Sequence, residues 1–393
     1  MNRTTAILGG NLLDGTGVPV LFDGVLLLEG ERIAAVGTRD EVDVPPDAYI
    51  IDASGCTVLP GLIEGHAHVG GDWPSVRTLR LSLQRGITTL CSVSANLKGI
   101  ALRDAIAAGQ VRGCSRMIAG CVVTPTHGHV KFRTADGPWE VRKAVREMVE
   151  AGADFIKTAA SGGFWAKNEK CASPNYTPEE LQALTQEAHA WGVPVAVHVH
   201  TQPGLSYCVE AGTDMIHHGA FIDEAAVRGI AARNLFYIPT LSVTCRRNID
   251  SLYDQPWQTE EMALAQPIHR AGVRLAYQLG VRIGVGCDYP GNPRGWEVGD
   301  RTLYELQELV RCGLSPMEAL LGATRINAEA YAKDDDLGTL TPGKRADVLV
   351  VAGDPLQDIS VLYDQANLCL VLKDGSVEYA REDYKNHYCM SDR

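Results

Sequence analysis

The sequence predicts an α/β protein, a (β/α)8 TIM-like barrel with a small β-sandwich built from both chain ends. Between residues 60 and 335, apolar strand-like runs alternate with Ala/Leu/Glu-rich helical patterns. Eight such pairs over roughly 250 residues are typical of this barrel. At 1–59 and 336–393, short strand patterns are separated by Gly/Asp turns, which indicates one β module assembled from the two ends.

The barrel elements follow from hydrophobic periodicity. Strands are expected at residues 61–69, 87–93, 117–123, 154–159, 193–200, 215–218, 236–243 and 282–288. Helices are expected at 75–85, 100–108, 139–151, 178–191, 204–211, 224–233, 260–279 and 301–312, followed by a pair at 316–323 and 327–332. In the N-terminal module, strands are expected at 6–8, 24–29, 32–36 and 56–59.

The composition argues against several classes of protein. A net charge of -12 does not suit a nucleic-acid or anionic-membrane partner, because both need a basic surface. The 11 cysteines include no CxxC pair, which fits a reducing cytoplasm better than a disulfide framework. The N-terminus lacks a continuous apolar segment, and no apolar run approaches the ~18–20 residues of a membrane helix. We therefore expect a cytoplasmic protein.

Six side chains with metal-binding chemistry lie at or near the carboxyl ends of expected strands, where barrel enzymes place their active sites. They are His66, His68, Lys157, His198, His218 and Asp288. In an extended strand His66 and His68 share one face about 6–7 Å apart, so both can reach one metal ion. Lys157 lies in an apolar strand, where an isolated charge is costly, so it needs a partner or a modification.

The sequence resembles the metal-dependent amidohydrolase superfamily, in particular its imidazolonepropionase/prolidase-like branch. The resemblance covers nearly the whole chain, through VLPGLIEGHAHV, GADFIKTAASGG, VAVHVH, HHGAF, GVGCDY and GTLTPGKRADVLVV. It implies a binuclear zinc centre, in which His66, His68 and Asp288 hold the more buried ion. His198 and His218 would hold the more exposed ion, and a CO₂-derived carbamate on Lys157 would bridge the two.

The resemblance also implies an activity, the hydrolysis of a C–N (amide-type) bond in a small molecule by a metal-bridging hydroxide. Asp288 would carry the proton from this hydroxide to the leaving nitrogen. The expected substrate is an N-acyl amino acid or a dipeptide, and a cyclic amide, carbamate or urea xenobiotic is the alternative. Two other hypotheses are a mononuclear zinc aminohydrolase (deaminase), which usually lacks the bridging lysine, and a non-catalytic structural relative. By analogy with the family, we expect a homo-oligomer.

Five further side chains are candidates for binding the substrate. His200 faces the same side as His198 and could rival it as a ligand. The spacing from His198 to His218 resembles that of the family, which favours His198 as the ligand, so His200 is expected to line the pocket. The others lie in loops after the third, fourth and seventh strands, where they could receive a ring or a carboxylate or form an ordinary solvated rim: His127, His129, Tyr176 and Arg246.

Three histidines are expected outside the site. His217 precedes His218, so strand alternation would turn it away from the metals, as a packing residue. His189 and His269 lie in helical patterns and are expected at the surface.

Overall fold

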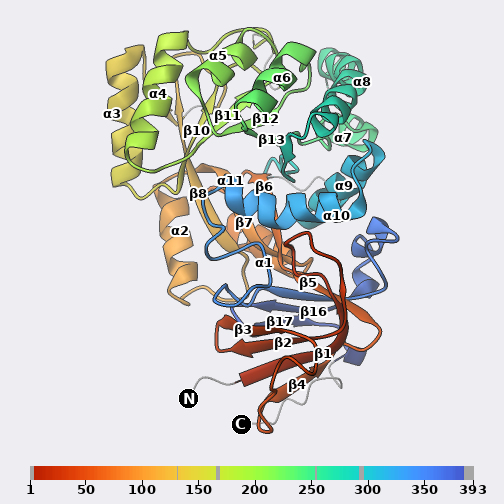
Figure 1. Cartoon of the computed structure of the whole chain (residues 1–393). Coiled ribbons are helices and arrows are strands. Elements are labelled where there is room, and N and C mark those ends of the chain that lie inside the picture. Colours follow the sequence, from red (N-terminus) through yellow and green to blue (C-terminus); the bar gives the residue numbers. More distant parts are fainter. Residues whose placement is uncertain (1–3, 131, 165–168, 253–254, 292–295, 385–393) are drawn as a thin grey trace.

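The computed structural model of the chain describes all residues except 1–3, 131, 165–168, 253–254, 292–295 and 385–393. The described residues form a barrel and a separate sheet, which lie one above the other in Figure 1. This is the fold class that the sequence predicts. Among the described residues, no helix is both long enough and apolar enough to cross a membrane.

The separate sheet contains strands from both chain ends. They are β1 (Thr4–Leu12), β2 (Leu21–Glu29), β3 (Arg32–Gly37), β4 (Tyr49–Asp52), β5 (Cys56–Pro60), β15 (Val348–Ala352), β16 (Leu368–Lys373) and β17 (Ser376–Ala380). Their order is β17-β16-β15-β5-β1-β2-β3, with β4 paired to β1. The two ends meet where β15 pairs antiparallel with β5, with Leu349 opposite Leu59.

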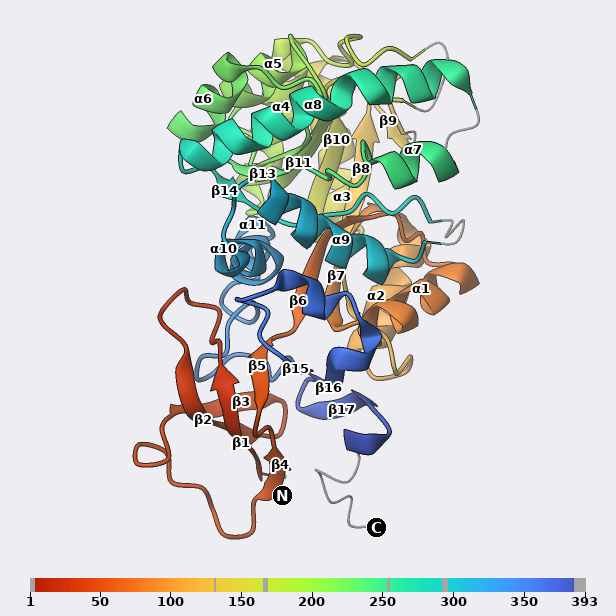
Figure 2. The ribbon, with the colours of Figure 1, turned by 90° about the vertical axis from the view of Figure 1, so that its right-hand side faces the viewer.

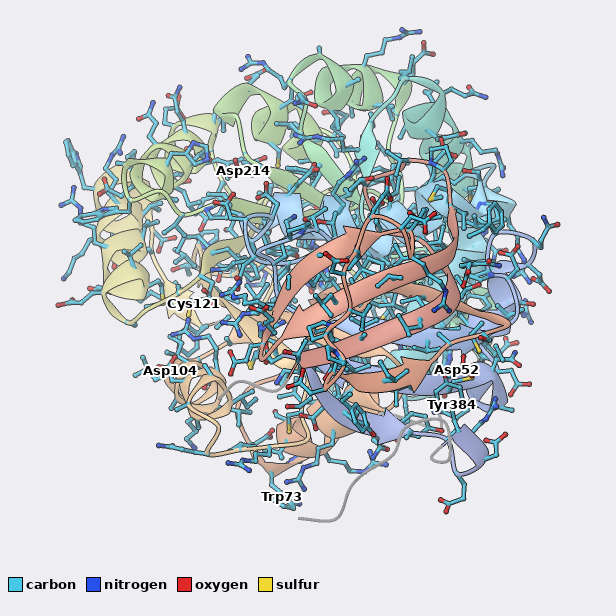
Figure 3. All side chains as sticks on the ribbon, turned by 60° about the horizontal axis from the view of Figure 1, so that its bottom comes forward. Asp52, Trp73, Asp104, Cys121, Asp214 and Tyr384 are labelled. Atoms are coloured by element: carbon cyan, nitrogen blue, oxygen red, sulfur yellow. The ribbon has the colours of Figure 1, made fainter. Side chains whose placement is uncertain are left out.

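This sheet folds over a shared apolar core. Ile7 and Leu26 from the N-terminal strands lie in the same buried cluster as Val350 and Leu370 from the C-terminal strands. The strands from the two chain ends therefore share one core within a single sheet. At the C-terminal end of the described chain, the Tyr384 hydroxyl donates to the backbone oxygen of Asp52, and Figure 3 shows the two residues side by side.

The barrel strands are mutually parallel. They are β6 (Leu62–Ala67), β7 (Ile87–Ala95), β8 (Arg116–Thr124), β10 (Phe155–Ala159), β11 (Val195–Val199), β12 (Met215–His218), β13 (Phe236–Ile238) and β14 (Arg282–Ile283), and a short strand β9 (Arg133–Thr134) pairs with β8. The order runs from β14 to β6. The chain after β14 closes the circle, because the amides of Gly65 and His68 donate to the carbonyl oxygens of Val285 and Tyr289 over 2.9 Å.

Helices surround these strands (Figures 1 and 2). They are α1 (Trp73–Leu83), α2 (Leu97–Ala107), α3 (Gly137–Glu150), α4 (Pro178–Ala190), α5 (Gly204–Ala211), α6 (Glu224–Ala232), α7 (Arg246–Leu252), α8 (Pro256–Gln278), α9 (Val298–Arg311), α10 (Pro316–Leu321) and α11 (Asn327–Ala330). A π-helical turn at Gly322–Ile326 joins the last two, and 3-10 turns lie at Ile359–Leu362 and Gln365–Asn367. The apolar faces of the α-helices pack on the barrel strands, as the sequence periodicity indicates.

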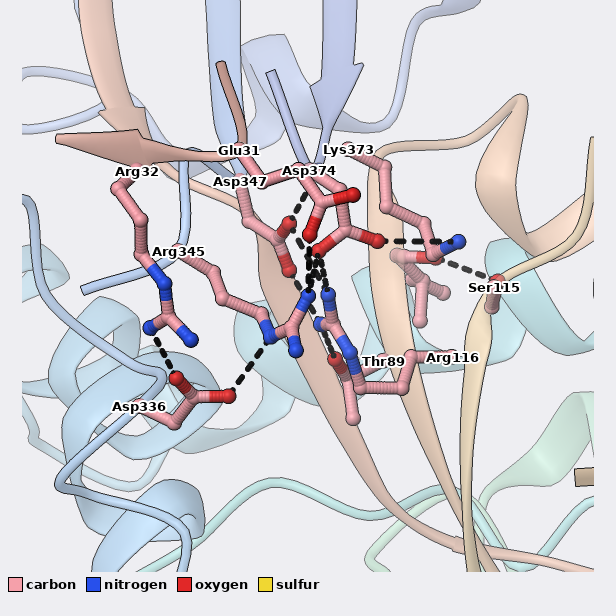
Figure 4. Close-up of polar contacts among 11 residues, drawn as sticks. Glu31, Arg32, Thr89, Ser115, Arg116, Asp336, Arg345, Asp347, Lys373 and Asp374 are labelled. Carbon is pink, nitrogen blue, oxygen red and sulfur yellow. Dashed lines mark hydrogen bonds and ion pairs between the residues drawn. The ribbon is translucent and has the colours of Figure 1, made fainter. Parts of the chain in front are cut away.

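A cluster of ion pairs joins the barrel to the sheet at the amino ends of the barrel strands (Figure 4). Arg116, the first residue of β8, donates to the Asp347 carboxylate over 2.6 Å and also pairs with Asp374. Arg345 contacts Asp374 and Asp336, each over 2.7 Å. The cluster therefore fixes the barrel on the sheet at the end opposite the carboxyl ends of the strands.

Candidate metal centre

The six predicted metal ligands line one pocket at the carboxyl ends of the barrel strands. His66 lies in β6 and His68 just after it, Lys157 in β10, His198 in β11, His218 at the end of β12, and Asp288 after β14. The pocket is a small cavity of about 40 Å³, which is large enough for water-sized species.

The tightest group consists of His66, His68 and Asp288. The Asp288 Oδ1 lies 3.2 Å from His66 Nε2 and 3.0 Å from His68 Nε2. One ligand atom from each of the three residues lies within 4.8 Å of the others. Burial lowers the pKa of His66 to about 4, so its ring is neutral near pH 7, as a metal ligand must be. Two neutral imidazoles and one carboxylate suit zinc chemically.

A buried carboxylate that the sequence analysis did not select holds this group in place. Glu64 accepts the backbone amide of His66 over 2.6 Å and that of Cys287 over 2.9 Å. It also accepts the Thr302 hydroxyl of α9 over 2.6 Å. Glu64 therefore ties the first strand to the chain after the eighth, directly beside ligands on both. Its signal in the sequence is an acidic residue in an apolar strand, which requires buried partners.

Lys157 is buried and has no carboxylate partner among the described residues. Its Nζ donates to the carbonyl oxygen of Thr158 over 3.1 Å. Burial lowers the pKa of Lys157 to about 7, against the opposing charge of Asp288. A substantial fraction of the amine is therefore neutral near pH 7, and this is the form that can react as a nucleophile.

His198 and His218 form the other side of the pocket, with ring centroids 4.4 Å apart. Burial lowers the pKa of both well below the usual value, which again favours the neutral ring. The Nδ1 of His218 lies 2.8 Å from the Thr240 hydroxyl. This contact leaves its Nε2 for an ion and sets the ring orientation, as second partners of ligating histidines commonly do.

The prediction that His217 points away from the metals is wrong. Its Nδ1 lies 2.6 Å from the Nδ1 of His66, and the side chain is buried inside the barrel without lining the pocket. His217 pairs in register with His198, and neighbouring residues in a sheet point to the same face. His218 is the residue that departs from strand geometry, because its φ of 73° turns its ring inward as well.

Two of the five candidate substrate-binding residues line the pocket. His200 is buried with its Nδ1 unpartnered, and its ring lies 4.7 Å from that of Phe164. His129 stacks on His198 with ring centroids 3.9 Å apart, and its Nδ1 is bonded to Glu169. Glu169 belongs to the loop after β10, and the sequence analysis did not assign it a place in the site. Phe164 also lines the pocket.

The other three candidates do not line the pocket. His127 is exposed. Tyr176 is buried, but its hydroxyl donates to the carbonyl oxygen of Val123 over 3.0 Å. Arg246 is 79% exposed and pairs with Asp250 one helical turn away. These placements do not support a contact between the three side chains and a substrate in the pocket.

Of the two helical histidines expected at the surface, one is there and one is not. His189 in α4 is 43% exposed and lies 2.7 Å from Asp214. His269 in α8 is completely buried, so this prediction is wrong. Its position falls on the buried face of α8, in line with Met262, Ala265 and Val273. This helical spacing could have identified it as an interior residue.

Comparison with known proteins identifies relatives over the whole chain. The sequence profile of the Amidohydrolase family matches residues 57–377. The ochratoxinase of Aspergillus niger is 28% identical over an alignment that covers 95% of this chain and 86% of that protein. The imidazolonepropionase of Symbiobacterium thermophilum is 24% identical over an alignment that covers 85% of this chain and 84% of that protein. A crystal structure of a Xaa-Pro dipeptidase with bound methionine in the active site is 30% identical in sequence and has a TM-score of 0.85. The match covers 96% of this chain and 100% of that chain.

Proposed function

The chain belongs to the amidohydrolase family, and from this premise we propose that it is a binuclear zinc hydrolase of a small molecule with an amide-type C–N bond. The convergence of six ligand-type side chains on one pocket supports the proposal most directly. His66, His68 and Asp288 would hold one ion, and His198 and His218 the other. Lys157, carboxylated on its amine, would bridge them.

The surroundings of Lys157 support its modification. Reaction of the neutral amine with CO₂ forms an N–C bond and releases one proton, which leaves an anionic carbamate with two oxygens. An ammonium group would repel two cations, whereas these two oxygens can each bind one. The burial that lowers the pKa of Lys157 to about 7 keeps much of the amine in the reactive form.

The roles of the protein groups follow from their positions. When bound, a pair of divalent ions lowers the pKa of a water and polarises the carbonyl group under attack. Asp288 lines the pocket beside the imidazoles of His66 and His68, so its carboxylate would be placed to accept the proton of the attacking water. The same carboxyl group can then deliver the proton to the leaving nitrogen. The net reaction adds one water across the C–N bond.

We propose an N-acyl amino acid or a dipeptide as the substrate class. The solved relative named as a Xaa-Pro dipeptidase, with methionine in its active site, favours this choice. The unpartnered Nδ1 of His200 offers a hydrogen-bonding group inside the pocket, and Phe164 and Val243 offer apolar contacts. A cyclic amide, carbamate or urea remains the second candidate class, which the imidazolonepropionase relative favours.

The test is a hydrolysis screen of the zinc-loaded protein, prepared with bicarbonate, together with zinc analysis per chain. N-acyl amino acids, dipeptides, lactams and aryl ureas would be compared with Asp288→Asn as the inactive control. We expect two zinc ions per chain and turnover of N-acyl amino acids or dipeptides that the variant lacks. One zinc per chain with no turnover of any of these substrates would favour a mononuclear deaminase, and no bound metal with no turnover would refute the proposal.

A further inference from the structure

The backbone carbonyl of His218 is held by two buried side chains from different elements. The Tyr237 hydroxyl of β13 donates to this oxygen over 2.9 Å. The His269 Nε2 of α8 lies 2.8 Å from the same oxygen. We call these two side chains the His218 clamp. Neither of them lines the pocket.

The polar atoms of the clamp are consistent with one hydrogen-bonding arrangement. A carbonyl oxygen can only accept, so the His269 Nε2 carries the hydrogen. The Nδ1 of His269 is then an acceptor, and the Thr244 hydroxyl lies 3.1 Å from it. Because every member is buried, loss of either donor would not be replaced by bulk water.

The clamp acts on a residue whose backbone is unusual. In the register of β11 and β12, His217 lies opposite His198, and His218 lies opposite Val199. Regular alternation would therefore direct His218 outward, like Val199, away from the pocket. Instead His218 and Gly219 have φ values of 73° and 66°. Residues other than glycine rarely adopt this left-handed conformation without support from their surroundings.

We propose that Tyr237 and His269 are positioning residues that hold His218 in this left-handed conformation and so turn its ring into the pocket. The two donors fix the direction of the carbonyl, and this direction fixes the peptide that follows His218. Thr240, 2.8 Å from Nδ1, then sets the rotation of the ring. The proposal rests on the proposed function in one respect, because it takes His218 as a zinc ligand.

The test compares two replacements of His269 with similar shape. In His269→Gln the amide nitrogen can replace Nε2 as donor, whereas His269→Met fills similar space without a donor. Tyr237→Phe removes the second donor and retains the ring, which provides an independent variant should His269→Met not fold. His189→Met serves as the control, because His189 is a helical histidine outside the pocket.

The readouts are the φ of His218 in crystals of metal-free protein and the affinity for each zinc, measured by competition with a chelator. We expect His269→Met and Tyr237→Phe to weaken one of the two zinc sites by about 10–100-fold, the usual effect of losing a partner behind a ligand. His218 should also leave the left-handed region, while His269→Gln and His189→Met should resemble the wild type.

Wild-type φ and zinc affinity in His269→Met and Tyr237→Phe would overturn the proposal. It would equally be overturned if His269→Gln lost as much affinity as His269→Met, because the donor would then not matter. If the wild type bound no zinc, the proposed function would fail, whereas the φ of His218 in the metal-free variants would still decide whether the clamp exists.

Discussion

Replacement of Glu64 tests whether a buried carboxylate holds the first and eighth strands together beside the pocket. In Glu64→Leu the backbone amides of His66 and Cys287 lose their acceptor. Each buried N–H left unsatisfied costs about 1–3 kcal/mol, so the free energy of unfolding should fall by about 2–6 kcal/mol. Zinc affinity should fall as well, because one of the two amides belongs to His66 and the other to Cys287, which directly precedes Asp288.

Glu64→Gln is the matched variant. Its amide oxygen can still accept both backbone amides, and the Thr302 hydroxyl can donate to the carbonyl oxygen of Val298, 2.9 Å away, and accept from the new NH₂ group. Burial raises the pKa of Glu64 to about 7, so the fold disfavours its charged form, and this offsets the weaker hydrogen bonds of a neutral acceptor. We therefore expect the free energy of unfolding of Glu64→Gln near pH 7 to stay within about 1 kcal/mol of the wild type. The exposed Glu179 provides a surface control, since Glu179→Leu should change stability by less than about 0.5 kcal/mol.

Urea unfolding of the chelator-treated proteins measures these differences without a contribution from bound zinc. We expect the wild type and Glu64→Gln to have similar stability and Glu64→Leu to be clearly less stable than both. If Glu64→Leu were as stable as Glu64→Gln, the two amides would have found other partners, and the role assigned to Glu64 would be refuted.

Three other predictions concern the pocket and its support. Lys157→Ala should retain at most one zinc per chain and lose most activity, with partial recovery on addition of a short carboxylic acid; full activity without that acid would contradict the carbamate bridge. Asp288→Asn should reduce turnover by about 10²–10⁴-fold, and near-normal turnover would exclude Asp288 as the proton carrier. Glu305 of α9 is buried and accepts the backbone amides of Leu241 and Ser242. Burial raises its pKa to about 8, so the folded protein binds its proton more tightly than the unfolded chain does. Wild-type stability should therefore fall relative to Glu305→Gln as pH rises from about 4.5 to about 8, by up to about 1.4 kcal/mol per pH unit, and parallel pH profiles would refute this.

The fold could be predicted because the barrel strands are apolar runs and five of the eight have ligand-type residues at or near their carboxyl ends. Six ligand-type residues stood at those ends, and the structure brings all six to one pocket. Their roles as ligands stay a prediction. The four candidate substrate-binding residues in loops were harder to place, because loop conformation depends on contacts that periodicity does not encode. Tyr176, for example, satisfies its hydroxyl on a backbone carbonyl instead of facing the pocket.

The orientation of His217 and His218 could not be read from alternation alone. Alternation assigns one of two neighbours to each face, but a left-handed residue breaks this rule. Gly219 directly after the pair is the sequence feature that permits such a turn. The contacts that sustain it come from Tyr237 and His269, which lie 19 and 51 positions along the chain. Such long-range partners leave no local trace in the sequence.

The pairing of β15 with β5 has a consequence for biosynthesis. Leu349 and Leu59 face each other although roughly 290 positions separate them, so the ribosome must synthesise the whole barrel after β5 before this interior ladder can form. Until then β5 presents an open, apolar edge, which is a template for aggregation. Chaperone dependence and inclusion-body formation should therefore respond to the rate at which the segment containing β15 emerges, even though β15, β16 and β17 contribute no group to the pocket.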